Sequence, residues 1–139
     1  MNDSTAAARF PSEIQALKQE ILSSLRCAMP GIVEAFDPET GTANVRPALK
    51  LRPAGTSGQS AGSSPLPLLY GVPVYLPEPR EIDPGAACLL IFADFDVDAW
   101  LASGEAEEPL SGRRHSLSDA FAFVGFRTNA ERQDADARH

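Results

Sequence analysis

Acidic residues alternate with other side chains at Asp94, Asp96 and Asp98, and this run comes nearest in the sequence to a ligand set. Glu105 stands at the twelfth position counted from Asp94, where an EF-hand calcium loop has its last ligand. The sixth position, however, is Ala99, where that loop needs glycine for its sharp turn. The acids also follow an apolar segment directly, with no helix before them. We therefore expect them to cap a strand end and the turn after it, and we predict no metal site.

His115, next to Arg113 and Arg114, is the other candidate for chemistry. A catalytic centre needs a nucleophile or base with an orienting partner. No serine lies in a glycine-rich nucleophile elbow, no carboxylates form a recognisable glycosidase pair, and no glycine loop suits a phosphate. We therefore expect His115 to be a hydrogen-bonded turn residue and the arginines to form surface ion pairs. The acids expected to pair with them are Glu107, Glu108 or Asp119. The prediction is a protein that is not an enzyme and has no catalytic residues and no cofactor.

The two cysteines, Cys27 and Cys88, are far apart in the sequence and form no metal-binding motif. Cys88 opens the apolar run at 88–92, which predicts a buried, unreactive thiol. Two cysteines cannot make a disulfide framework.

The charge balance argues against two classes of partner. Nineteen acidic residues outnumber twelve basic ones, which gives a net charge of −7. Binding to a nucleic-acid backbone or an anionic membrane requires clustered lysine and arginine, so we expect neither. The first thirty residues lack a basic segment followed by an apolar one, and no apolar run is long enough to span a bilayer. We expect synthesis in the cytoplasm without a cleavable signal.

Residues 13–27 are predicted to form the only long helix. Ser12 to Gln15 match a capping box, and a break at 29–31 is expected to end the helix. Its apolar residues recur at helical spacing and form one stripe, namely Ile14, Leu17, Ile21, Leu22 and Leu25. The stripe has two interpretations: it packs on its own domain, or it docks onto a partner, with Ile14, Leu17, Ile21 and Leu25 as the docking residues.

After this helix the apolar period becomes two, and 22 Gly and Pro residues indicate many turns. Strands are expected at 31–36, 42–51, 68–76, 87–93 and 120–126, the first two as a hairpin. Pro47 should place the second strand at an edge or on a bulge, and 87–93 should be the most buried strand. Further predictions are a Gly/Ser-rich loop at 53–65, a helical turn at 98–103 around Trp100, and a polar tail at 128–139. The fold class is mainly β, a five-stranded OB-type barrel preceded by one α-helix, although periodicity alone does not separate it from an SH3-like barrel.

Several segments together resemble one known family. The pattern runs from Met29-Pro30-Gly31-Ile32-Val33 through the hairpin ending at Lys50, then through 68–74 with Pro73, and on to Pro84-Gly85. It continues with the strand ending at Asp94 and with Trp100. It closes with His115, Asp119, Phe121 and Gly125. In this order, over about residues 28–127, the chain resembles the N-terminal domain of the phage baseplate spike family typified by the gp138 protein.

The resemblance implies an OB-fold that forms a homotrimer at the centre of a contractile-tail baseplate. Pro30, Gly31, Pro73, Gly85, Trp100, His115, Asp119, Phe121 and Gly125 would then be structural motif residues. In this family a β-helix with a membrane-piercing tip usually follows, and here only a short polar segment does, so the tip is expected to be absent or to come from another chain. Ala86 also stands where the family usually has Asp.

The predicted function is therefore a trimeric central spike or hub module, located in the virion at the tail baseplate, that closes the tube and helps membrane penetration. The expected partners are a baseplate hub protein, a separate tip or spike protein at the C-terminal end, and transiently the target cell envelope. The predicted organisation is an arm and helix at 1–28, the OB-fold domain at 29–127 and the tail at 128–139. The alternative is an OB-fold that binds single-stranded nucleic acid or oligosaccharide. A tail-borne cell-wall hydrolase is a third, less favoured hypothesis.

Overall fold

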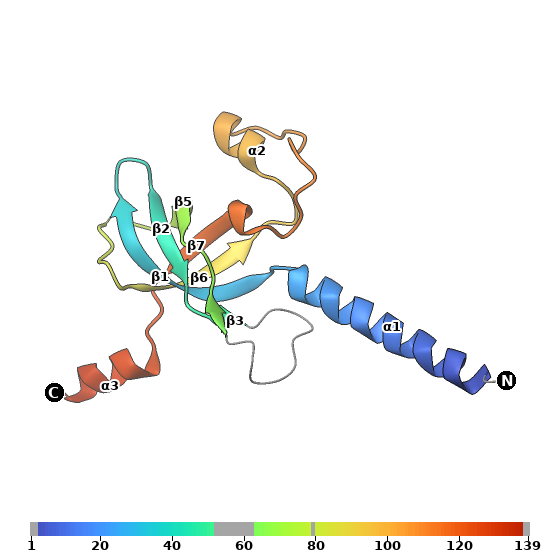
Figure 1. Ribbon diagram of the computed structural model, residues 1–139. Coiled ribbons are helices and arrows are strands. Elements are labelled where there is room, and N and C mark those ends of the chain that lie inside the picture. Colours follow the sequence, from blue (N-terminus) through green and yellow to red (C-terminus); the bar gives the residue numbers. More distant parts are fainter. Residues whose placement is uncertain (1–2, 52–62, 79, 138–139) are drawn as a thin grey trace.

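The computed structural model describes residues 3–51, 63–78 and 80–137. A small barrel lies between two helices that extend away from it, α1 at the N-terminal end and α3 at the C-terminal end (Figure 1). The helices are α1 (Asp3–Ser24), α2 (Asp98–Ser103) and α3 (Asn129–Ala137), with a 3₁₀ turn, η1 (Leu117–Asp119). The strands are β1 (Ala28–Asp37), β2 (Thr42–Pro47), β3 (Lys50–Leu51), β4 (Ser64–Pro65), β5 (Leu69–Tyr75), β6 (Ala87–Phe92) and β7 (Ala120–Val124).

Five strands close the barrel in the order β1-β2-β5-β7-β6, and β1 and β6 complete the ring. All neighbours are antiparallel except β5 and β7, which run parallel and pair Val74 with Ala122. This closed, mainly β architecture confirms the predicted OB-type barrel with an N-terminal helix. β3 and β4 form a separate two-stranded ribbon beside it.

The barrel interior is filled by one apolar cluster. Val33, Val45 and Leu90 are completely buried at its centre, and Ala122 closes the β7 side. Because side chains in a strand alternate between two faces, β2, β6 and β7 contribute every second residue to this core. The alternation predicted for Ala43 and Val45 is confirmed, as is the placement of Phe121 and Phe123 on the other face from Ala122.

A bulge in β5 changes the predicted pattern of the third strand. Simple alternation placed Leu69 and Val72 on opposite faces, but both are buried. Gly71, between them, has a φ of 63°, a conformation that glycine adopts without a steric penalty. The extra residue lets Leu69 face Val45 while Val72 faces Ala43. The N–H of Gly71 donates to Oδ1 of Asn44 at 3.3 Å, which holds the bulge.

The predicted N-terminus of the helix was wrong. α1 begins at Asp3 and runs through Ser12, so Ser12 does not cap it. An alanine-rich stretch precedes Pro11, and its high helix propensity favours a helix that begins before the predicted start. The helix ends at Ser24, before the predicted Cys27. None of the helices among the described residues is long and apolar enough to cross a membrane.

Residues 29–31 were expected to end the helix. The helix already ends at Ser24, and these residues lie inside β1. Pro30 pairs with Leu89 of β6, and its carbonyl accepts from the N–H of Ala48 at 2.9 Å. Gly31 is buried between Val45 and Cys88. A proline is tolerated in a strand where its position requires no backbone N–H donor. Pro30 is therefore accommodated near the start of β1.

Four further predictions need correction. Pro47 ends β2, which lies between β1 and β5 and is not an edge strand. The second strand was expected to extend to residue 51. Leu49 instead lies in the connection after β2, and Leu51 belongs to β3.

β6 is buried on its inner face only, since Ile91 on the outer face is 38% exposed. The C-terminal tail contains α3. Of the loop predicted at 53–65, residues 53–62 lie outside the described residues, and its end forms β4.

Candidate functional site

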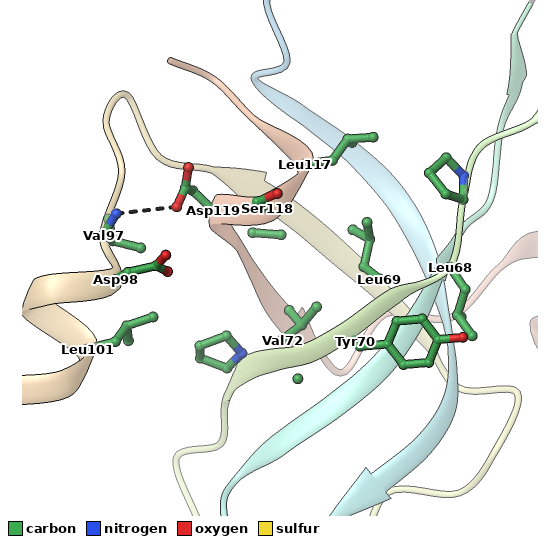
Figure 2. A pocket seen from close by; sticks show the side chains of 14 residues that line it. Leu68, Leu69, Tyr70, Val72, Val97, Asp98, Leu101, Leu117, Ser118 and Asp119 are labelled. Atoms are coloured by element: carbon green, nitrogen blue, oxygen red, sulfur yellow. Dashed lines mark hydrogen bonds between the residues drawn. The ribbon is translucent and has the colours of Figure 1, made fainter. Parts of the chain in front are cut away.

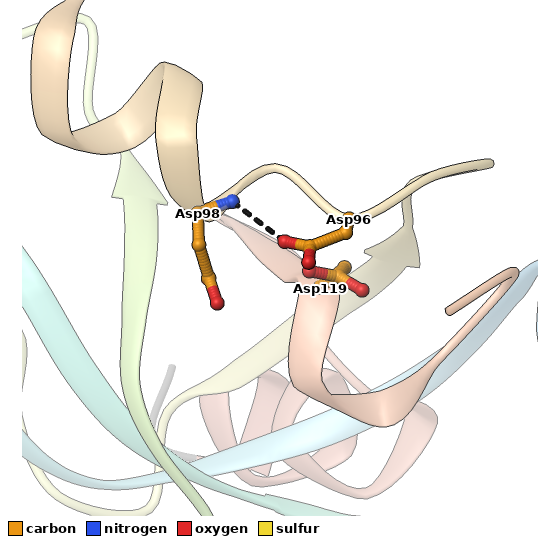
Figure 3. Close-up of side chains that lie close together, drawn as sticks. All are labelled: Asp96, Asp98 and Asp119. Atoms are coloured by element: carbon orange, nitrogen blue, oxygen red, sulfur yellow. Dashed lines mark hydrogen bonds between the residues drawn. The ribbon is translucent and has the colours of Figure 1, made fainter. Parts of the chain in front are cut away.

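Three carboxylates converge where the β6–β7 connection returns to the barrel. Asp96 follows β6, Asp98 begins α2, and Asp119 ends η1 just before β7 (Figure 3). One carboxylate oxygen from each lies within 4.8 Å of the others. Asp96 and Asp119 are buried, whereas Asp98 is exposed. Sequence reasoning singled out Asp96 and Asp98 but placed Asp119 elsewhere, because its partners are distant in the sequence.

Arg113 occupies the centre of this cluster. Its Nη2 donates to Asp96 at 2.9 Å, to Asp98 at 3.0 Å and to Asp119 at 2.9 Å, and its Nε donates to the second oxygen of Asp119 at 3.1 Å. The hydrogen bonds that Arg113 donates to Asp119 and, next, to Asp98 raise the pKa of Arg113 above its ordinary value. A guanidinium therefore stands among these carboxylates, at the place where a cation would bind.

Hydrogen bonds to the backbone complete the network. The N–H of Asp98 and the hydroxyl of Ser111 both donate to Asp96, and the N–H of Val97 donates to Asp119 at 3.3 Å. The pKa of Asp96 is lowered chiefly by the Asp98 N–H, then by Ser111 and by the charge of Arg113. The expectation that the acids of this run cap the turn after the strand is confirmed for Asp96, which accepts from the N–H of Asp98. The network ties the long β6–β7 connection to the start of β7.

His115 has a structural environment rather than a catalytic one. Its φ of 47° places it in a turn. Nδ1 lies 3.1 Å from the carbonyl oxygen of Arg26, and Nε2 lies 3.5 Å from Asp94. These contacts join the turn before β7 to the segment between α1 and β1, as expected for a hydrogen-bonded turn residue. Arg114 lies over the ring of Phe95, 4.2 Å from its centroid, so the predicted pairing of the arginines with acids is confirmed only for Arg113 with Asp119.

The other motif residues are placed around the same side of the barrel and in its turns. Trp100 on α2 packs on Phe121 of β7, with ring centroids 6.2 Å apart. The N–H of Gly85 donates to the carbonyl of Val33 at 2.7 Å. Gly125 directly follows β7, and Pro73 lies in β5 opposite Thr42. Their surroundings are those of fold-stabilising residues.

A pocket of about 530 Å³ lies between the start of β5, α2 and η1. Figure 2 shows Tyr70 and Leu101 at its sides and the Asp119 carboxylate hydrogen-bonded to Val97 at its edge. Among the residues that line it there is no lysine or arginine, and Asp98 and Asp119 add negative charge. The pocket therefore does not suit a phosphate backbone. Its lining residues were not predicted, because the pocket is formed by elements that come together only in the fold.

The apolar residues of α1 lie apart from the barrel. Ile14, Leu17 and Ile21 are 50%, 57% and 49% exposed, and Leu25 is 39% exposed. The helix extends into solvent in Figure 1. Among the described residues the stripe is therefore exposed, contrary to the interpretation that it packs on its own domain.

The comparisons with known proteins agree with this architecture. Residues 29–125 match the family described as the phage protein Gp138 N-terminal domain. The matched segment runs from the start of β1 to the residue after β7 and so contains the whole barrel. The comparison with curated proteins gives no match.

Proposed function

Since the chain belongs to the phage protein Gp138 N-terminal domain family, we propose that it is a structural component of a contractile-tail baseplate. In this proposal it forms a trimeric central spike or hub module on the tail axis. The module closes the tube and helps membrane penetration during injection. Its partners are further copies of the chain, a surrounding hub protein and, beyond β7, a tip that contacts the cell envelope.

The family match over the whole barrel is the observation that carries this proposal. The side-chain chemistry is compatible with it, because the carboxylates of the strongest polar constellation are all hydrogen-bonded within the fold by one guanidinium. Arg113 is shared among Asp96, Asp98 and Asp119, so these carboxylates serve to hold the β6–β7 connection. A protein that transmits force needs connections fixed in this way more than it needs a reactive group.

Deleting the gene and restoring it in trans tests the proposal. We expect lysates of the deletion strain to lack infectious or cell-killing particles, and complementation to restore them. Gold-labelled antibody should mark the distal end of purified tails. Label along the tail sheath or on the head, or fully active particles without the protein, would overturn the assignment.

The nucleic-acid alternative is tested by a mobility-shift assay with single-stranded oligonucleotides at low salt. We expect no shift, because acidic residues outnumber basic ones in the chain and the pocket between β5, α2 and η1 has no basic residue in its lining. A shift that weakens steeply with added salt would favour the alternative.

A further inference from the structure

Four apolar residues of α1, from Phe10 to Ile21, have the spacing of a heptad repeat. From Phe10 to Ile14, Leu17 and Ile21 the steps are four, three and four residues, which is the spacing of alternating d and a positions. Ile14 and Ile21 then occupy a, and Phe10 and Leu17 occupy d. All four are at least 49% exposed. A repeat of this kind fits another helix, because each a or d side chain inserts between four residues of the facing helix.

The charged residues beside the stripe distinguish between possible partners. In this register Glu13 and Glu20 occupy g, and Lys18 and Leu25 occupy e. In a parallel coiled coil a g residue faces the e residue five positions later on the neighbouring helix. Glu13 would then face Lys18 of another copy. Within a single helix these two residues do not face each other, since neighbouring side chains are three or four positions apart.

The same charges disfavour an antiparallel arrangement of two copies. There g residues face g residues, so Glu13 would lie opposite Glu20, and like charges repel. The sequence of α1 therefore complements a second copy of itself, and only when both helices run in the same direction.

We propose that copies of this chain associate through α1 in a parallel coiled coil, with Ile14, Leu17 and Ile21 on the seam and Glu13 paired with Lys18 of the neighbouring copy. The pairing requires no phage partner and stands independently of the proposed function. If the protein forms the trimer proposed above, the three helices form its N-terminal stalk. A hub protein on the same stripe is the competing occupant.

The structure leaves room for this stalk. α1 has 22 residues, a length of about 33 Å at 1.5 Å per residue, and in Figure 1 it extends clear of the barrel. In proteins most helical stability comes from packing of an amphipathic face rather than from helix propensity. Burying its apolar residues against neighbouring copies removes them from solvent and stabilises the helix.

Cysteine cross-linking of the purified full chain tests the arrangement. Cys27 is exposed and is first replaced by Ser, while Cys88 is buried and can stay. L17C then places a thiol at d, and Q19C places one at f on the opposite side of the helix. On mild oxidation we expect disulfide-linked dimers from L17C and almost none from Q19C. Equal cross-linking of both variants, or none of either, would overturn the proposal.

A charge exchange provides a second, independent test. E13K and K18E should each weaken self-association several-fold, measured by sedimentation equilibrium at low salt. The double variant E13K/K18E should restore it, because the pair is re-formed between copies with its signs exchanged. Failure of the double variant to recover would exclude the pairing of Glu13 with Lys18. If L17C does not cross-link but Leu17→Ser prevents incorporation into particles, the stripe binds another chain and the proposal is wrong, while the proposed function stands.

Discussion

Arg113 is the residue on which the β6–β7 connection depends. It is one third exposed, yet its guanidinium is shared by two buried carboxylates and one exposed carboxylate. Removing one partner from such a group leaves charges and hydrogen-bonding groups unsatisfied, and this costs more than the net value of the pair. The network should therefore be sensitive to single substitutions.

We predict that Asp119→Ala lowers the free energy of unfolding by about 3 kcal/mol. The substitution removes the acceptor for Nε of Arg113 and for the N–H of Val97. Asp119→Asn is the matched control, since its amide oxygen can still accept from Val97, and we expect a smaller loss. Urea unfolding measures both. Equal stability of Asp119→Ala and the unmodified chain would show that the network does not stabilise the fold.

Asp96 should make stability depend on pH in the acid range. Its pKa in the fold lies below the ordinary value of 3.8, so the folded state favours the ionised carboxylate. This contribution is present above the unfolded pKa and is lost as the pH falls through the folded pKa. We expect the urea midpoint to fall below about pH 4, and to fall less steeply in Asp96→Asn. Identical profiles for the two proteins would contradict this.

The two thiols should differ in reactivity. Burial raises the pKa of Cys88 to about 11, so almost no thiolate forms there near neutral pH, whereas Cys27 is exposed. We expect a thiol reagent to modify one cysteine per native chain at about pH 8 and two in denaturant. Cys27→Ser should abolish the native reaction, and modification of Cys88 in the native protein would show that the barrel opens.

At the scale of the elements, the side chains packed against Gly31 limit which residue β1 can carry at this position. A Cβ on Gly31 would lie 2.7 Å from Cγ1 of Val45 and 3.0 Å from Sγ of Cys88. We predict that Gly31→Ala destabilises the protein by about 1–3 kcal/mol through overpacking. Gly112→Ala, which meets no atom within 4 Å, should change stability by less than about 0.5 kcal/mol. Thermal unfolding of the two variants makes the comparison, and equal melting temperatures would refute it.

The type of most elements could be predicted from the sequence, because alternation marks buried strands. β2, β6, α2 and β7 were found within a few residues of their predicted positions. The start of α1 could not be predicted, because a capping box at Ser12 competes with an alanine-rich segment that continues the helix. The Gly71 bulge was also missed, since a one-residue insertion is defined by its pairing with β2 rather than by local pattern.

At the scale of the whole molecule, the candidate site was only partly predictable. The run containing Asp96 and Asp98 was visible, but Arg113 and Asp119 join it through the closure of the barrel. The partner of an arginine that has several acids within reach is determined by topology, and spacing in the sequence does not give it. The exposure of the α1 stripe could likewise be established only from the fold.

We predict that the purified full chain has a mass in light scattering of three times the chain mass of 14.8 kDa. The apolar stripe of α1 and the half-exposed outer face of β6 should be covered in the assembly. Replacing Leu17 and Ile21 by Ser should lower this mass and leave the melting of the barrel nearly unchanged. A loss of barrel stability in this double variant would place the helix in the core instead.

The position of β7 has a consequence for the order in which the protein forms during translation. β7 is the last strand to be made, yet it lies between β5 and β6, its parallel and antiparallel neighbours. Until residue 124 has left the ribosome, β5 and β6 each expose an unpaired edge, and such edges promote aggregation of nascent chains. Ribosome stalling between β6 and β7 would therefore prolong exposure of these edges, and a chaperone that covers them would protect the unfinished barrel.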